Sequence, residues 1–258
     1  MPKDLAIKLD DKLRAKRESF DKLPVIDIAP LLDCSNKQRV AKEIRWALSN
    51  TGFMYISQDF VSSVFDVSCR FFELPMAQKM MLHISNSDVA FRGYIEPFGE
   101  NTDPGKTKDL KECFDIGPER SILEGPFFGP NQWPSNLPEC RELTYRYHQT
   151  MVALAKTLLR GIALSLDLSE SFFQDLMRNP ISILRLLHYP PQSGYVNEDI
   201  IGIGAHTDYG ILTILAQDDM GGLQVMNRDG DWVEGTPIRG TFVINIGDLI
   251  QRLTTVST

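Results

Sequence analysis

Apolar residues in the first two-thirds of the chain recur mostly every three or four positions, as they do in amphipathic helices. The pattern is clearest over residues 36–50, where one face carries Val40, Ala41, Ile44, Ala47 and Leu48. The same spacing predicts further helices over 60–72, 75–83, 139–166 and 169–177. Two early apolar runs predict strands over 23–32 and 52–57.

The pattern changes in the middle of the chain and again at Ile181. Residues 88–138 are rich in Gly and Pro and predict mostly loop, with one strand over 112–117. From Ile181, short apolar runs predict strands over 181–189, 200–207, 211–217, 222–227, 231–235 and 241–247. The pair Asp229-Gly230 is typical of a tight hairpin turn. Helices therefore come first, and a β-core of the sandwich or barrel type follows them.

The run IIGIGAHTDYGILTILA, residues 200–216, contains the most distinctive polar residues of the β-core. In a strand, alternate side chains share a face, so His206 and Asp208 would lie on the same side as Gly202 and Gly204. An imidazole and a carboxylate on a bare face are typical of two legs of a 2-His-1-carboxylate site for non-haem Fe(II). A single histidine in a strand is more often a packed core residue, so the spacing alone leaves both readings open.

Composition and charge narrow the classes of function. The chain has 258 residues and a net charge of −7, without a Lys/Arg-rich block, so nucleic acid is not expected as a partner. No apolar run approaches membrane-spanning length, and the charged start shows no secretory signal. The four cysteines form no CxxC pair, which favours reduced thiols and a cytoplasmic location.

Eight segments in order carry a family resemblance: LPVIDIAPLL, RGYIEPFGE, LKECFDIGPE, LRLLHYPP, GAHTDYGILTIL, GGLQV, WVEGTPIRGTFVINIGD and LIQR. They resemble the isopenicillin N synthase-like group of Fe(II)/2-oxoglutarate oxygenases, from about residue 22 to Arg252. The resemblance implies a mainly β fold with α additions, namely a double-stranded β-helix (jelly roll) preceded by an α-helical N-terminal region. It divides the chain into a non-haem dioxygenase N-terminal region, 22–138, and a helix plus oxygenase core, 139–258.

The implied function is oxidation of a small organic molecule with Fe(II) and 2-oxoglutarate, in which a ferryl species abstracts hydrogen, with ascorbate as a candidate reductant. The resemblance makes His206 and Asp208 iron ligands and places Tyr189 on 2-oxoglutarate. Arg185 shares a strand face with Tyr189 and is its nearby cation. Arg92 resembles a residue of isopenicillin N synthase that holds a substrate carboxylate. A core role for Tyr189 and a structural ion pair for Arg185 remain open.

The remaining polar candidates have plainer interpretations. His83, His148 and His188 lie outside the motif positions and are interpreted as surface or core residues. Lys79 is assigned to the polar side of its helix.

The end of the sequence departs from the family pattern. No histidine follows Asp208, whereas the family places a second ligand His and an Arg-x-Ser pair after the segment that matches LIQR. We therefore expect a C-terminally truncated or alternatively spliced form that lacks the last core strands. The strand over 241–247 would then be an exposed edge open to association. Two alternatives follow: an inactive isoform that acts as a binding partner, or an oxidase of the same fold that does not use 2-oxoglutarate.

Overall fold

The computed structural model describes residues 8–9, 24–50, 53–57, 61–102, 108–192, 195–196, 200–227 and 230–255. The chain forms two compact units, each built from segments that are distant in the sequence. Unit 1 comprises Met1–Arg14, Ser63–Gln149 and Ile181–His206, and unit 2 comprises Ala15–Ser62, Thr150–Pro180 and Thr207–Thr258. The sequence-based division at residues 138 and 139 follows chain order instead and stays a prediction.

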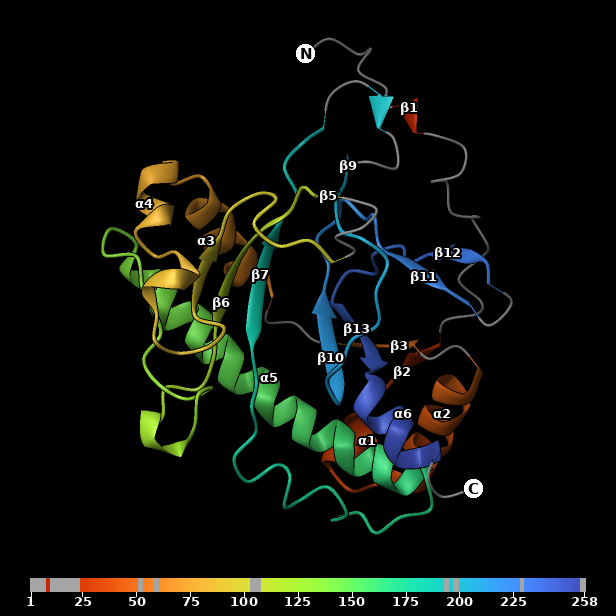
Figure 1. Cartoon of the computed structure of the whole chain (residues 1–258). Coiled ribbons are helices and arrows are strands. Elements are labelled where there is room, and N and C mark those ends of the chain that lie inside the picture. Colours follow the sequence, from red (N-terminus) through yellow and green to blue (C-terminus); the bar gives the residue numbers. More distant parts are fainter. Residues whose placement is uncertain are drawn as a thin grey trace. The chain divides into compact units, whose positions relative to one another are not determined.

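Strands and helices are mixed along the chain up to Ser165, and the strands over residues 184–246 then follow one another before a helix that begins at Asp248 (Figure 1). The α-helices are α1 (Ala29–Leu32), α2 (Lys37–Asn50), α3 (Ser62–Phe72), α4 (Met76–Met80), α5 (Pro138–Ser165) and α6 (Asp248–Thr255), and the short 3-10 helices are Ile84–Asn86 and Ile122–Glu124. The strands are β1 (Lys8–Leu9), β2 (Val25–Ile26), β3 (Phe53–Ser57), β4 (Gly93–Ile95), β5 (Lys108–Asp109), β6 (Glu112–Ile116), β7 (Leu184–His188), β8 (Tyr195–Val196), β9 (Ile200–Ile201), β10 (Leu212–Ala216), β11 (Gln224–Met226), β12 (Trp232–Glu234) and β13 (Thr241–Ile246).

Unit 1 is centred on the antiparallel sheet β4-β6-β7. Phe114 of β6 lies opposite Tyr94 of β4 and Leu186 of β7, and all three are buried. The ring centroid of Phe114 lies 4.4 Å from that of Phe71 on α3. Aromatic packing of this kind buries a large apolar area, so the core of unit 1 lies where α3 meets β6.

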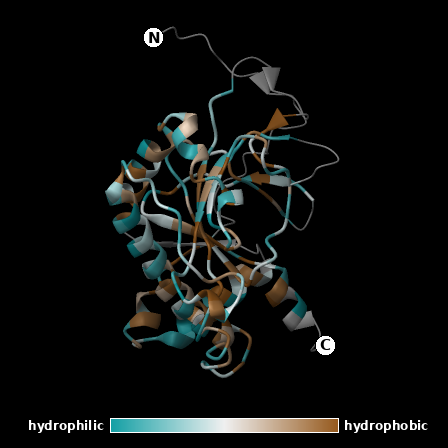
Figure 2. Ribbon diagram, turned by 60° about the vertical axis from the view of Figure 1, so that its left-hand side comes forward, coloured by the Kyte–Doolittle hydropathy of each residue, from teal (hydrophilic) through white to brown (hydrophobic). Residues whose placement is uncertain are grey.

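Unit 2 is centred on the sheet β10-β13-β3-β2. Strand β13 pairs antiparallel with both β10 and β3, and β2 pairs parallel with β3. Helix α2 packs against β2 and β3 and buries Val40, Ala41, Ile44 and Ala47. Figure 2 shows the corresponding hydropathy pattern: strands are mostly brown, whereas helices mix brown and teal residues. Strands β11 and β12 form a separate antiparallel hairpin.

Several sequence predictions of elements are confirmed. The helices expected over 36–50, 60–72 and 139–166 correspond to α2, α3 and α5. The strands expected over 211–217, 222–227, 231–235 and 241–247 correspond to β10, β11, β12 and β13. Gly230, at the predicted hairpin, has φ +82°, the left-handed conformation that such turns use. Its partner Asp229 lies outside the described residues.

Other expectations about elements are wrong. Residues 169–177 form turns and not a helix, and the backbone N–H groups of Phe172 and Gln174 bond to the carbonyls three positions before them, as in successive turns. The predicted loop over 88–138 holds β4 and β5 in addition to the expected β6. The helix expected over 75–83 is shorter, because α4 ends at Met80.

The expectation that residues 241–247 form an exposed sheet edge is also wrong. Strand β13 has a neighbour on each side, and Phe242, Val243 and Ile244 are buried. The second neighbour, β3, comes from almost 200 positions earlier in the chain, since Val243 pairs with Tyr55. Period-two alternation does not reveal which distant strand completes a sheet, so the sequence alone could not show this pairing.

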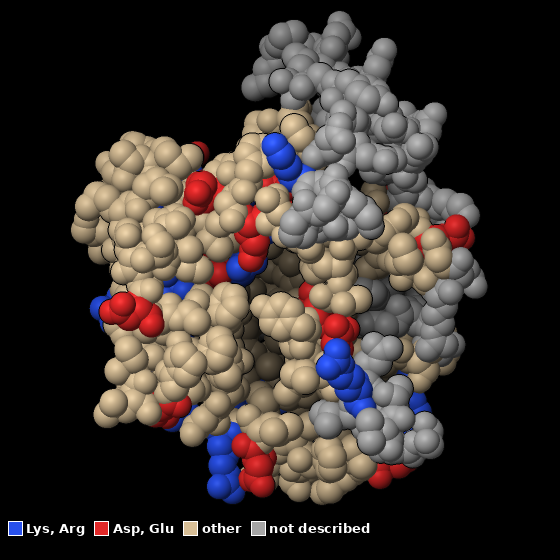
Figure 3. Space-filling view, in the orientation of Figure 1, with Lys and Arg blue, Asp and Glu red and all other residues tan. Residues whose placement is uncertain are grey.

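Two further findings concern membrane crossing and surface charge. No helix in the described part of the chain is both long and apolar enough to cross a membrane. Acidic and basic side chains of the described residues are interspersed on the face shown in Figure 3.

Candidate functional site

The stretch around His206 and Asp208 is not the continuous strand that the alternation predicts. Strand β9 ends at Ile201, β10 begins at Leu212, and the residues between them have no strand conformation. The sequence-based argument that His206 and Asp208 share a strand face is therefore wrong. The reason is that backbone groups in this stretch bond to side chains and to a neighbouring turn, and not to a sheet ladder. The two residues are described below within their own units.

His206, in unit 1, is held in one ring tautomer. Its Nδ1 lies 2.9 Å from the backbone carbonyl oxygen of Gly204. A carbonyl oxygen only accepts, so Nδ1 carries a proton and donates it, which in a neutral imidazole is the Nδ1–H tautomer. A backbone carbonyl on the other ring nitrogen is the usual partner of a metal-binding histidine. The side chain is exposed, which is compatible with ligand access.

Asp208, in unit 2, is held by two neighbouring strands. The Thr213 hydroxyl of β10 and the Asn245 side-chain amide of β13 both donate to Asp208 Oδ2, the latter at 2.9 Å. Thr213 and Asn245 are direct partners across the β10–β13 ladder, so their side chains lie on the same face. The ladder thus fixes the orientation of the carboxylate.

The turn that carries Asp208 is bonded to the start of α6. The Asp248 backbone N–H donates to the Asp208 carbonyl at 2.8 Å, and the Thr207 hydroxyl donates to Asp248 Oδ2 at 3.1 Å. Gly247 makes this approach possible, because a Cβ there would lie 2.1 Å from the Gly210 carbonyl oxygen and 2.6 Å from that of Asp208. Any larger residue at 247 would displace the turn.

Tyr189 packs against the segment that leads to His206. A Cβ on Gly202 would lie 3.0 Å from Tyr189 Cδ1, so the space that this glycine leaves accommodates the tyrosine ring. The ring is about half exposed, and desolvation raises the pKa of Tyr189 to about 12. The phenol is therefore neutral at physiological pH and keeps an O–H that can donate a hydrogen bond.

Arg185 is engaged by two carboxylates of unit 1. Its guanidinium bonds bidentately to the buried Asp115, at 2.8 and 2.7 Å, and Nη1 donates to Glu100 at 2.8 Å. Burial alone would lower the pKa of Arg185, but its hydrogen bonds to Asp115 and the charge of that carboxylate raise it above the usual value. The structural ion pair left open by the sequence is therefore present, and a role toward 2-oxoglutarate stays a prediction.

Arg92 is fully buried and bonded to the backbone. Nη1 donates to the carbonyls of Ala90 and Phe91, and Nη2 donates to those of Pro118 and Phe127. Burial lowers the pKa of Arg92 from its usual value. These contacts give Arg92 a part in holding loops of unit 1 together, and its assignment to a substrate carboxylate remains untested.

The donors in the motif fit Fe(II) in part. An imidazole with its lone pair on Nε2 and a carboxylate oriented by neutral donors are ligands that this ion accepts. Within the described ranges, no group of three or more His, Cys, Asp or Glu side chains is arranged to hold a metal ion. His206 and Asp208 are thus donors of the kind that such a site uses, and their assignment as iron ligands stays a prediction.

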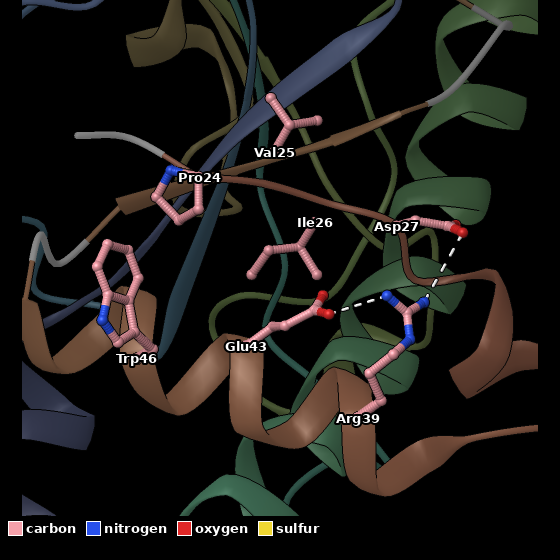
Figure 4. Close-up of a pocket in the computed structure, with 7 residues that line it drawn as sticks. All are labelled: Pro24, Val25, Ile26, Asp27, Arg39, Glu43 and Trp46. Atoms are coloured by element: carbon pink, nitrogen blue, oxygen red, sulfur yellow. Dashed lines mark hydrogen bonds and ion pairs between the residues drawn. The ribbon is translucent and has the colours of Figure 1, made fainter. Parts of the chain in front are cut away.

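Unit 2 also contains a hollow of about 380 Å³, and the residues that line it are distant in the sequence from His206 and Asp208. The hollow lies between β2 and α2 and is lined by Pro24, Val25, Asp27, Arg39, Glu43 and Trp46 (Figure 4). Arg39 bridges Glu43 at 2.8 Å and Asp27 at 3.9 Å. None of the residues predicted from the sequence to bind a ligand lines this hollow.

The residues that orient the motif were not identified from the sequence. Thr213, Asn245 and Asp109 each bond to the motif or to the segment before it. Asn245 interrupts the apolar run FVINI, and a polar residue in a central strand is a signal that could have marked it. Asp109 gives no such signal, because its contact joins positions 95 residues apart.

Comparison with known proteins identifies the family. Residues 23–136 match the family described as non-haem dioxygenase in morphine synthesis N-terminal, and residues 180–256 match the 2OG-Fe(II) oxygenase superfamily. The chain is 35% identical over 249 residues to a 2-oxoglutarate-Fe(II) type oxidoreductase, hxnY, of Emericella nidulans, covering 89% of this chain and 71% of that protein. It is 37% identical over 256 residues to a homoarginine-6-hydroxylase of Arabidopsis thaliana, covering 90% and 69%.

A solved structure gives the same assignment. A full-length Neurospora crassa protein crystallised in complex with alpha-KG is 34% identical, with a TM-score of 0.78 over 92% of this chain and 77% of that one. The chain belongs to the 2OG-Fe(II) oxygenase superfamily and has its jelly-roll fold. It is by family an oxidoreductase that uses Fe(II) and 2-oxoglutarate on a small molecule, which confirms the function expected from the sequence and does not favour the binding-partner alternative.

Proposed function

We propose that His206 and Asp208 bind the Fe(II) of this chain and that Tyr189 and Arg185 serve 2-oxoglutarate. The observation that carries the proposal is the Nδ1 contact of His206 with the Gly204 carbonyl, since a metal-binding histidine commonly donates its other ring N–H to such a partner. The orientation of Asp208 by Thr213 and Asn245 supports the second ligand. A single residue, Thr207, separates the two proposed ligands in the chain.

In this proposal the iron, when bound, activates O2 at the expense of 2-oxoglutarate so that a C–H bond of the substrate is oxidised. The chain supplies orientation. The neutral Tyr189 phenol donates its O–H to a carboxylate of 2-oxoglutarate, and Arg185, held by Asp115 and Glu100, orients the strand that leads to that tyrosine. Thr213 and Asn245 keep the Asp208 carboxylate from rotating.

The test is conversion of 2-oxoglutarate to succinate with Fe(II) and ascorbate. We expect succinate from the unaltered chain and from a control, His83→Gln, whose side chain bonds to Glu96 and Ser85 outside the motif. His206→Ala and Asp208→Ala should reduce the rate to background and weaken Fe(II) binding measured by calorimetry. Equal succinate formation by His206→Ala would refute the ligand assignment.

We further propose that the substrate is a small, polar, nitrogen-containing molecule. The support is in the names of relatives: the Arabidopsis thaliana protein is a homoarginine-6-hydroxylase, and a Neurospora crassa structure contains thymine. Homoarginine and thymine are therefore the first compounds to test, by mass-spectrometric detection of a product 16 Da heavier (roughly one oxygen atom). If succinate forms without any such product, the oxygenase assignment stands and these two substrates are refuted.

A cytoplasmic location is also proposed. All four cysteines, Cys34, Cys69, Cys113 and Cys140, are free thiols. Unpaired thiols are usual in a reducing compartment. Fractionation of cells that express a tagged chain would test the location.

A further inference from the structure

Asp109 is a buried carboxylate to which the oxygenase assignment gives no role. Its side chain is fully buried on β5 of unit 1. Oδ2 accepts hydrogen bonds from Lys111 Nζ at 2.8 Å, from the Thr102 backbone N–H at 2.9 Å and from the Thr102 hydroxyl. These contacts hold one carboxylate oxygen in place.

The other carboxylate oxygen reaches the segment that carries His206. Asp109 Oδ1 accepts the Gly204 backbone N–H at 2.9 Å, across 95 positions of sequence. The carbonyl oxygen of the same glycine accepts the proton of His206 Nδ1, also at 2.9 Å. Gly204 is therefore bonded through its N–H to Asp109 and through its carbonyl to the imidazole, which gives a continuous path of two hydrogen bonds.

The surrounding pairing holds this path in register. Strand β5 pairs parallel with β9, with Asp109 opposite Ile201. The Leu110 N–H donates to the Ile201 carbonyl at 2.9 Å, and the Lys111 N–H donates to that of Gly202 at 3.3 Å. Backbone pairing ends at Gly202, so the next donor, Gly204 N–H, is held by the Asp109 side chain in place of a strand.

Charge and burial favour a fixed carboxylate. Burial by itself would raise the pKa of Asp109, but the hydrogen bonds from Lys111, Thr102 and Gly204 outweigh it and lower the pKa. Lys111 is 2% exposed in its side chain and lies 3.3 Å from Glu100 as well. A buried, paired carboxylate has little freedom to move, which suits it to fix a backbone position.

We propose that Asp109 is a positioning residue that sets the orientation and tautomer of the His206 imidazole through Gly204. The inference rests on the proposed role of His206 as an iron ligand, and it adds a residue that touches neither metal nor substrate. Loss of a partner that orients a metal-binding histidine commonly lowers metal affinity 10–100-fold. We expect Asp109→Ala to lower Fe(II) affinity by roughly this factor.

The chain offers a matched control for the loss of a buried ion pair. Glu112 pairs with the buried Lys79 at 2.7 Å, as Asp109 pairs with Lys111 at 2.8 Å. The hydrogen bonds of Glu112 go to Lys79, Tyr94 and His188, outside the segment of residues 200–206. Glu112→Gln should therefore affect stability but leave the Fe(II) affinity of the chain unchanged.

A second variant separates the contact to Gly204 from the ion pair. In Asp109→Asn combined with Lys111→Met, the ion pair is gone, but the asparagine Oδ1 can still accept the Gly204 N–H. We expect this double variant to recover most of the Fe(II) affinity that Asp109→Ala loses. If the affinity depended on the ion pair and not on the contact to Gly204, the double variant would bind Fe(II) as weakly as Asp109→Ala. The double variant also tests the inference if Asp109→Ala fails to fold.

The decisive measurement is made on the whole chain without and with Fe(II). The 15N shifts of the His206 ring report the tautomer, and calorimetry gives the metal affinity. The expected result is a Nδ1–H tautomer in the unaltered chain and in Glu112→Gln, and mixed tautomers with weaker Fe(II) binding in Asp109→Ala. An unchanged tautomer and affinity in Asp109→Ala would overturn the inference. The two proposals can be distinguished. If the His206 tautomer depends on Asp109 but His206→Ala leaves Fe(II) binding unchanged, Asp109 is a positioning residue and His206 is not an iron ligand.

Discussion

At the scale of single residues, the largest departure from the sequence pattern is Lys79. The helical pattern assigns it to the polar side of its helix, but it is only 5% exposed. Its Nζ donates to Glu112 Oε2 at 2.7 Å and to the Phe72 carbonyl at 2.9 Å. Tyr94 and His188 also donate to Glu112, so one buried carboxylate satisfies three side chains. A long amphipathic side chain can follow either face of a helix, and its partner decides which.

The Lys79–Glu112 pair gives the first prediction about stability. Glu112→Gln leaves the Lys79 ammonium buried without its carboxylate, so we expect a loss of about 3 kcal/mol in the free energy of unfolding. Replacing both residues, Lys79→Met with Glu112→Leu, should cost less than Glu112→Gln alone, because no charge then remains buried. Urea unfolding measures both values. A double variant less stable than Glu112→Gln would contradict this expectation.

At the scale of elements, close helix packing in unit 2 depends on a glycine of α5. A Cβ on Gly161 would lie 2.8 Å from Ile44 Cδ1 of α2 and 2.9 Å from Leu31 Cδ2 of α1. All three elements therefore meet at a position with no room for a side chain. The predicted helix over 139–166 was correct in extent, but the sequence did not show that Gly161 marks a contact point. A glycine within a helix costs helix propensity, which is a signal for such a contact.

We predict that Gly161→Val destabilises the chain by about 1–3 kcal/mol, because the added methyl groups overpack a filled core. The matched control is Ala153→Val, which adds the same branched side chain to an exposed position of the same helix. That control should change stability by less than about 1 kcal/mol, since only helix propensity differs. Thermal unfolding of both variants distinguishes the two effects, and equal losses would contradict the packing argument.

At the scale of the whole molecule, buried carboxylates make the stability depend on pH. Burial alone would raise the pKa values of Glu100, Asp109, Glu112 and Glu119, but hydrogen bonds and nearby cations outweigh it and lower them. Each group therefore binds protons less readily in the folded chain than in the unfolded chain. All four belong to unit 1, and in unit 2 the pKa values of Asp33 and Glu170 are lowered as well.

The sign of the pH effect follows from these lowered pKa values. Stability from these groups is fully present above their unfolded pKa, near 4, and is lost as the pH falls through the lower folded values. We expect the free energy of unfolding to decrease between pH 5 and 3 by about 1.4 kcal/mol per pH unit for each additional proton that the unfolded chain binds. Urea unfolding at several pH values tests this. A stability that stays constant or rises over that range would contradict it.

The sequence by itself determined much of the molecule. Helical spacing placed α2, α3 and α5, and short apolar runs bounded by turns placed β10 and β13, because both patterns reflect local backbone geometry. The ordered motifs identified the oxygenase family and singled out His206 and Asp208, which remain proposed ligands. A motif carries such information because the chemistry requires particular side chains at a fixed spacing.

Only the tertiary structure decided how those side chains are held. No local pattern indicates that β3 pairs with β13, that Asn245 orients Asp208, or that Asp109 bonds to Gly204. It also predicted a strand through His206 where the chain bonds to side chains and turns instead. These contacts join residues far apart in the chain, and they form only when burial brings distant segments together. Local pattern therefore names the candidate ligands, and long-range packing sets their geometry.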